Sequence, residues 1–183
     1  MLSSQADVAR LAGCTEARAL TIRSGAPLDT SVLRALSAIS GDLVIGPTVA
    51  VDAIRFPALR TLDGALRVRD NGLAQGVFFP RLERAGAVEV DHNAALTTVS
   101  LPQLARVARG LAITDDASLE LIDVPRLEVV GGAVVIANQP SLTLVEGAAL
   151  RHAESVRIDG APKLPDDVVA RLRATPGLAD LPR

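Results

Sequence analysis

Apolar and polar residues repeat along this chain with a period of 22 or 23 residues. The clearest unit is a pair of apolar residues separated by one residue. It recurs as Leu20/Ile22, Leu43/Ile45, Leu66/Val68, Val88/Val90, Leu111/Ile113, Val134/Ile136 and Val156/Ile158. Alternation over so few positions is typical of a half-buried strand, and a fixed period of this length indicates a solenoid. A glycine often precedes the pair, which indicates a corner of the chain.

A second apolar motif, Pro-x-Leu, keeps the same period. It occurs in Phe56-Pro57-Ala58-Leu59, Phe79-Pro80-Arg81-Leu82, Leu101-Pro102-Gln103-Leu104 and Val124-Pro125-Arg126-Leu127. A third apolar series, Leu73, Leu96, Leu119, Leu142 and Leu164, follows polar segments that contain Asp70-Asn71-Gly72, Asp91-His92-Asn93, Asp115-Asp116, Asn138-Gln139 and Asp159-Gly160. Because Asn, Asp and Gly accept bent or left-handed backbone, these polar segments are predicted to be turns.

Three apolar pairs in each period predict three sides. The chain is therefore expected to be mainly β, as a right-handed parallel β-solenoid of about six to seven 22–23-residue turns with three short sheets. The composition agrees, since 49% of the residues are hydrophobic but only three are Phe and none is Trp or Tyr. Stacked aliphatic rows leave little room for bulky rings. A leucine-rich-repeat horseshoe is the alternative fold, because residues 66–73 match the core of that repeat.

Residues 1–183 are predicted to form one domain with a short helix capping each end. The expected parts are an N-terminal capping helix (1–13), the repeats (14–164), a C-terminal capping helix (165–175) and a tail (176–183). Ser4 and Asp7 have the spacing of a capping box, and Gly13 is placed to end the first helix. Pro165 with Asp166 and Asp167 is typical of a helix start. Such caps would cover the terminal apolar rows and strand edges.

The spacing of these motifs resembles the receptor L domain, a module of insulin and epidermal growth factor receptors and of fungal cell-wall proteins. The resemblance covers roughly residues 14–164 and combines the run from Leu33 to Ile45, which ends in Gly41-Asp42-Leu43-Val44-Ile45, with the Pro-x-Leu turns. The chain would be a cysteine-poor, bacterial-type member of this leucine-rich-repeat-like family. The resemblance implies a right-handed β-solenoid used for recognition, without catalysis. The near-absence of cysteine and aromatic residues argues against a growth-factor-like ligand.

No arrangement of residues typical of catalysis or metal binding is found. His92 and His152 occupy different positions in the repeat, and Cys14 has no neighbouring base in the sequence. Cys14 is expected to be a small core residue near the cap, since free cysteine is often buried. The adjacent acids Asp115 and Asp116 are expected to be solvated turn residues rather than a cation site. We therefore expect no enzyme activity, no cofactor and no metal, and no small-molecule ligand.

Charge and hydropathy restrict the class of partner and the cellular location that we expect. A net charge of −2 argues against a nucleic-acid surface, and residues 129–145, the longest charge-free stretch, are interrupted by Gly, Asn, Gln and Pro. Residues 11–14 match the lipobox of bacterial lipoproteins, but the preceding residues are polar and charged rather than apolar. A cytoplasmic location is therefore favoured. A cell-envelope protein anchored by a lipid on Cys14 is the alternative.

The residues that point outward beside the inward pairs define the predicted functional surface. The partner-binding residues expected there are Arg67, Arg69, Glu89, Ala112, Thr114, Val135 and Ala137. Small apolar residues facing outward on a sheet suggest a contact surface. The function predicted is a non-catalytic protein-interaction or scaffold module that recognises a partner protein or a second copy of itself. The alternative is an adhesive cell-envelope protein that binds a glycan or another surface ligand.

Overall fold

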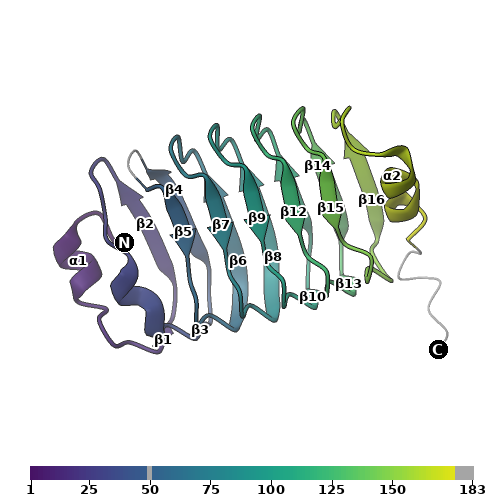
Figure 1. Ribbon diagram of the computed structural model, residues 1–183. Coiled ribbons are helices and arrows are strands. Elements are labelled where there is room, and N and C mark those ends of the chain that lie inside the picture. The colour runs from purple at the N-terminus through teal and green to yellow at the C-terminus, as the bar shows by residue number, and fades with distance from the viewer. Residues whose placement is uncertain (49–50, 176–183) are drawn as a thin grey trace, which may run out of the picture.

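The computed structural model, which describes residues 1–48 and 51–175, is a parallel β-solenoid of about six turns with a helix at each end (Figure 1). Face A consists of β2 (Leu20–Ser24), β4 (Leu43–Thr48), the second half of β6 (Thr61–Arg69), the second half of β8 (Arg84–Asp91), β11 (Leu111–Thr114), β14 (Ala133–Ala137) and β16 (Ser155–Asp159). Face B consists of β5 (Ala53–Arg55), β7 (Gly76–Phe78), β9 (Thr98–Ser100), β12 (Leu121–Asp123) and β15 (Leu144–Glu146). Face C consists of β1 (Glu16–Ala17), β3 (Ala38–Ile39), the first halves of β6 and β8, β10 (Arg106–Val107) and β13 (Val129–Val130).

The three predicted sides are present, but two of them are joined. Faces A and C form one 11-stranded sheet, because β6 and β8 run through the corner between the faces, whereas face B is a separate sheet of five strands. The register between β6 and β8 shifts between Leu62 and Ala65, where β6 bends. Gly64 lies at this bend, and a Cβ atom there would overlap the backbone of Gly41 in the turn before. Glycine therefore permits the continuous corner.

The predicted inward pairs form the core. Every member of the seven pairs is buried except Val156, which is half-buried, and the four Pro-x-Leu leucines are also buried. The prediction for the third apolar series is wrong at one position. Leu73 is 53% exposed and Ala74 takes the inward position. In the following turns the inward residue stands three positions after a buried polar residue, as Leu96 follows Asn93, and Ala74 has this spacing from Asn71.

The polar corners between faces A and B contain a buried ladder, which we define as Thr48, Asn71, Asn93, Asp116 and Gln139. All five side chains are at most 2% exposed, so the prediction of a solvated turn residue is wrong for Asp116. The residue before each of the last four has a positive φ near 55–61° (Asp70, His92, Asp115 and Asn138). This left-handed residue turns the chain, and the next side chain then points inward.

Hydrogen bonds connect the ladder from turn to turn. The Asn71 amide nitrogen Nδ2 donates to Asn93 Oδ1 (2.9 Å), and Asn93 Nδ2 donates to Asp116 Oδ1 (3.0 Å). Both asparagines also donate to carbonyls of the adjoining strands, as Asn93 does to Val68 and Asp91. The ladder thus satisfies most of the polar groups that the corners bury, with the exception of Gln139 Oε1.

A helix at each end is confirmed, but the first ends at Ala9 with Arg10 as its C-cap, not at Gly13 as predicted. Helix α1 (Gln5–Ala9) begins at Ser4 with the predicted capping box to Asp7, and its Val8 is buried. Helix α2 (Asp166–Arg173) begins after Pro165 and buries Val168 and Leu172. Neither helix is long and apolar enough to cross a membrane, which holds for the residues that the structure describes. The predicted tail, 176–183, lies outside the described residues.

The N-terminal end has two features that the sequence did not predict. Leu2 pairs with the edge of β2, since Leu2 N donates to Thr21 O (2.7 Å) and Arg23 N donates to Leu2 O (3.0 Å). A 3-10 helix, η1 (Ser31–Ala35), lies where the first turn would otherwise supply a strand to face B. Its Leu33 is buried in the core.

Candidate functional site

The structure brings all seven predicted partner-binding residues onto face A. They come from β6 (Arg67, Arg69), β8 (Glu89), β11 (Ala112, Thr114) and β14 (Val135, Ala137). One row runs in register through Arg67, Glu89, Ala112 and Val135, and the next runs through Arg69, Asp91, Thr114 and Ala137. Neighbouring strands of a sheet lie about 4.8 Å apart, so each row is a continuous stripe across the strands.

The charged part of face A is held by its own ion pairs. Arg67 Nη1 lies 2.6 Å from Asp42 Oδ2, and Arg67 Nε lies 2.8 Å from Glu89 Oε2. The hydrogen bond from the Ala65 backbone N–H, followed by that from Arg67, lowers the pKa of Asp42. The Asp42 carboxylate in turn raises the pKa of Arg67. Arg67 and Glu89 are therefore committed to this network.

An uncharged patch follows the ion pairs along face A. We define it as Ala112, Thr114, Val135 and Ala137, which are paired across β11 and β14 and are all half-buried. Beyond it, on β16, Arg157 pairs with Asp159 of its own strand. The patch thus lies between two ion-paired groups, Arg67 with its two carboxylates on one side and Arg157 with Asp159 on the other. Between them the sheet presents small side chains.

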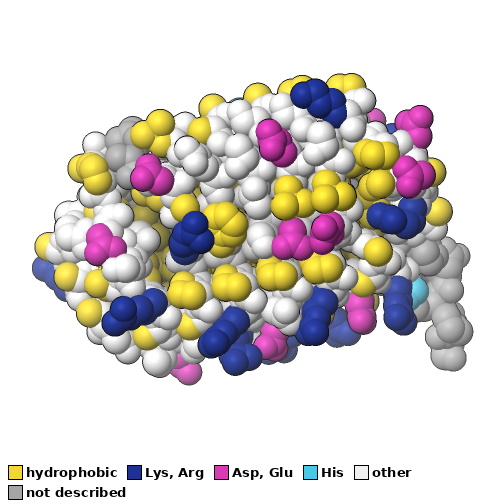
Figure 2. Space-filling model, viewed as in Figure 1, with side chains coloured by type: hydrophobic (Ala, Val, Ile, Leu, Met, Phe, Trp, Pro, Cys, Tyr) yellow, Lys and Arg dark blue, Asp and Glu magenta, His cyan; other side chains and the backbone are white. Residues whose placement is uncertain are grey.

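Face B carries a second patch that the sequence analysis missed. Leu121 and Leu144 are paired across β12 and β15, and Asp123 pairs in register with Glu146. Leu144 is 43% exposed, which makes it one of the most exposed large apolar residues among those described. Figure 2, which looks onto this face, shows hydrophobic side chains beside acidic ones over β12 and β15. The alternation around the inward residues Ile122 and Val145 could have revealed it.

The phenylalanines do not offer a free aromatic platform. Phe56 and Phe79 are buried and stacked, with ring centroids 5.3 Å apart. Phe78 points outward on face B, where its ring covers Gly76 and the Arg55 guanidinium lies 4.3 Å from the ring centroid. A sugar that stacks on the ring face covered by Arg55 would have to displace this guanidinium.

The residues considered for chemistry do not come together. His92 lies exposed at a corner between faces A and B, where the Asp91 carboxylate beside it raises its pKa, whereas His152 pairs with β13 on face C. Cys14 is half-buried rather than a core residue. Across the described ranges 1–48 and 51–175, no three His, Cys, Asp or Glu side chains are grouped to hold a metal ion.

The two adjacent acids Asp115 and Asp116 have different environments. Asp115 is half-buried at the surface and accepts a hydrogen bond from Asn138 (2.8 Å). Asp116 is fully buried in the ladder, and burial raises its pKa to about 6. A carboxyl group inside a hydrogen-bonded ladder, without other ligand oxygens, is a structural group rather than a cation site.

Among the described residues, face A thus carries a flat patch of small side chains, and His92, His152 and Cys14 lie apart. Comparison of the chain with protein-family models, with curated proteins and with solved structures finds no match. The resemblance to the receptor L domain therefore stays a prediction, and the geometry of faces A and B is the basis for the function.

Proposed function

We propose that this chain is a non-catalytic recognition module that binds a partner protein through the uncharged patch of face A. The observation that carries the proposal is the in-register set of four small, uncharged, half-buried residues on an open sheet face. Exposed positions of a solvated sheet normally carry polar side chains, so this departure favours a contact surface. The core of protein interfaces is likewise depleted of charged residues.

The arrangement of charges around the patch supports the same proposal. Arg67 is satisfied by Asp42 and Glu89, so a partner that lies on the patch need not leave these charges unpaired. Arg69 is exposed in the row that leads to the patch and forms no ion pair with any described residue. It would contribute to the polar rim, where a charge steers association more than it adds affinity.

Charge substitutions in the patch are expected to abolish partner binding without unfolding the chain. The variant Ala112→Lys/Val135→Glu places the new lysine between Glu89 and the new glutamate, which itself lies beside Arg157, so opposite charges alternate across the strands. Such cross-strand pairs do not destabilise a sheet. Burying two new charges in an interface should weaken binding at least about tenfold. Affinity purification from the native cells, quantified by mass spectrometry, measures the loss.

The matched control carries the same kind of substitution on face B. In Leu121→Lys/Leu144→Glu the two changed residues are also paired across neighbouring strands, and the net charge also stays the same. The proposal expects this variant to retain the partners of the wild type. Loss of partners in the face B variant and their retention in the face A variant would move the recognition surface to face B.

A second copy of the chain is included as a partner. Sedimentation of the wild type at high concentration would then show a dimer, which the face A variant dissociates. A cytoplasmic location belongs to this proposal. The envelope alternative, with a lipid on Cys14 and a glycan ligand, has less support, because Arg55 covers the one outward aromatic ring. Acylation of Cys14, detected by mass spectrometry of the native protein, would favour that alternative.

A further inference from the structure

The sheet of face B ends at a strand edge that is open toward the N-terminus. β5 is the last strand of this sheet and pairs only with β7. Asp52 O accepts from Gln75 N (2.8 Å), and Phe56 N donates to Phe78 O (3.1 Å), so residues 52, 54 and 56 face β7. Backbone groups alternate in direction along a parallel strand. The N–H and C=O groups of Ala53 and Arg55 therefore face away from β7, and they have no hydrogen-bond partner within the described chain.

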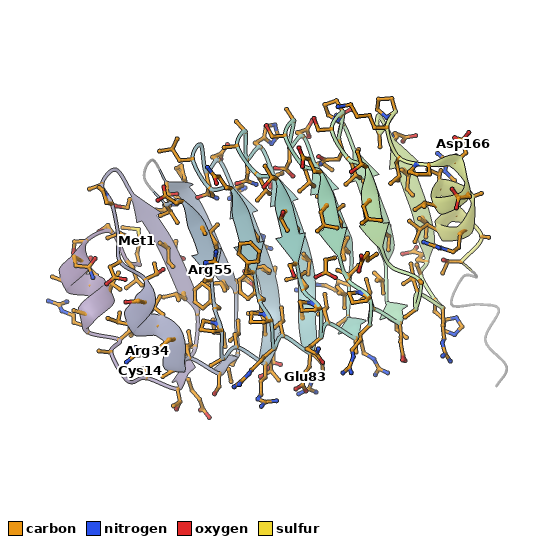
Figure 3. All side chains as sticks on the ribbon, viewed as in Figure 1. Met1, Cys14, Arg34, Arg55, Glu83 and Asp166 are labelled. Atoms are coloured by element: carbon orange, nitrogen blue, oxygen red, sulfur yellow. The ribbon has the colours of Figure 1, made fainter. Side chains whose placement is uncertain are left out.

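The preceding turn does not supply a strand to this edge. A step of 23 residues back from Ala53–Arg55 leads to residues 30–32, which form the start of η1 and the residue before it. Between η1 and β5 lies an open groove of about 590 Å³, a size typical of ligand sites. Figure 3 labels Arg34 on η1 and Arg55 on β5, which belong to the two walls of the groove. The neighbouring edge of β2, by contrast, is paired by Leu2.

A narrow apolar hollow opens beside the same edge. It is lined by Ile22, Ile45, Val51, Ile54 and Phe56, with Thr30 and Arg55 among its other neighbours. In every later turn of face B, the inward side chain of one strand packs on the inward side chain of the next, as Ile122 does with Val145. At β5 the corresponding position above Ile54 is taken by no strand residue of the described chain. The hollow has a volume of about 10 Å³ and Ile54 is only 3% exposed, so the end of this row has room for no more than a terminal methyl group.

We infer that the β5 edge is a strand-addition site for an extended segment of a partner polypeptide. The segment would continue the sheet of face B, with hydrogen bonds to Ala53 and Arg55 and with the terminal methyl group of one aliphatic side chain over the hollow. Main-chain hydrogen bonds supply affinity in this mode, and the side-chain hollow supplies selectivity. The groove presents both signs of charge, Asp29 and Asp52 with Arg34 and Arg55, which suits a segment of low net charge. The site is separate from the uncharged patch of face A.

A fluorescently labelled peptide with the sequence of residues 51–57 is the probe. Parallel solenoids stack near-copies of a turn in register, so this peptide places its isoleucine over the hollow. Saturable binding by fluorescence anisotropy is expected. Ala53→Pro removes an N–H that faces the groove and leaves the β5–β7 ladder intact, as proline does on edge strands. It should weaken binding about tenfold or more, with an unchanged thermal unfolding midpoint.

N-methylation of the peptide provides the matched pair of controls. A methyl group on the isoleucine nitrogen, which faces β5, should abolish binding, whereas one on the alanine nitrogen, which faces away, should not. Hydrogen exchange of the wild type gives an independent readout, because the peptide should protect the amides of Ala53 and Arg55. Absence of binding up to millimolar peptide, or equal binding to Ala53→Pro, would overturn the inference. If the wild type forms a dimer that Ala53→Pro dissociates, the added segment comes from a second copy of the chain and not from a separate polypeptide.

Discussion

Asp116→Asn is expected to stabilise the folded chain at neutral pH by about 3 kcal/mol. Burial raises the pKa of Asp116 from 3.8 to about 6, so a charge must be accommodated in the ladder at pH 7. A difference of about two pKa units corresponds to about 3 kcal/mol. Asparagine removes the charge and keeps the oxygen that accepts from Asn93 N (2.8 Å) and Asn93 Nδ2 (3.0 Å).

The ladder also explains why an amide fits this position better than a carboxylate. Asn71 and Asn93 each have a side-chain Nδ2 that donates a hydrogen bond to the next residue of the ladder. Asp116 has the acceptor Oδ2 in the corresponding position. Its contact is Gln139 Nε2 at 3.5 Å, and Gln139 Oε1 is buried without a partner among the described atoms. The new amide could donate to that oxygen once the Gln139 amide rotates. An unsatisfied buried acceptor costs about 1–3 kcal/mol, so the gain has a second source.

The sign of the pH dependence follows from the raised pKa. Between about pH 4 and pH 6 the folded state binds more protons at Asp116 than the unfolded state does. The contribution of Asp116 to the free energy of unfolding therefore falls as the pH rises through this window, and it is lost as the pH passes through about 6. In Asp116→Asn this fall should disappear.

Urea denaturation of the wild type and Asp116→Asn at several pH values between 4 and 8 measures both effects. Asp115→Asn is the matched control, since it makes the same change at a half-buried neighbour. It should alter the free energy of unfolding by less than about 0.5 kcal/mol. Equal stabilisation by the two substitutions, or a lower stability of Asp116→Asn at pH 7, would contradict the assignment of a buried charge to the ladder.

Gly64→Ala is expected to cost about 3 kcal/mol or more of folding free energy. The added Cβ would overlap the backbone of Gly41 and lie 2.5 Å from Asp42 N. Both contacts are with backbone atoms of the preceding turn, which cannot move aside as a flexible side chain could. Gly64 N also donates to Gly41 O (3.1 Å), so relief of the clash would break a bond of the corner.

Gly72→Ala is the control for this substitution. A Cβ atom at Gly72 would meet nothing within 4 Å, and the residue does not have a positive φ. Its unfolding free energy should stay the same or rise by less than about 1 kcal/mol, since alanine restricts the unfolded chain. Similar urea midpoints for the two variants would show that the corner between faces A and C tolerates separation of its turns.

Periodic features of the chain could be predicted because they recur in every turn. The inward pairs, the Pro-x-Leu leucines and the alternation of strands with corners each appear in several copies, so a single exception such as Leu73 does not hide them. The caps could be predicted because Ser4, Asp7 and Pro165 act on their own local backbone. Local chemistry and repetition are the two kinds of information that one sequence carries well.

The ladder and the strand edge depend on contacts between turns. Asn93 and Asp116 have the composition of a turn, and nothing local shows that one residue of each corner points inward. Their spacing of 23 residues, continued at intervals of 22 by Asn71 and 23 by Gln139, was the available signal. The open edge of β5 arises because residues 31–35 form η1, a departure from the repeat that no later turn shares within the described residues.

The central claim, that a partner protein is recognised through the uncharged patch of face A, is tested most directly by site-specific photo-crosslinking in the native cells. A photoreactive phenylalanine analogue would replace Val135 on face A, Leu144 on face B or Val129 on face C, all of which are at least partly exposed. The proposal predicts a discrete crosslinked adduct at position 135 and none at the other two. An adduct at position 144 or 129 with none at 135 would contradict it.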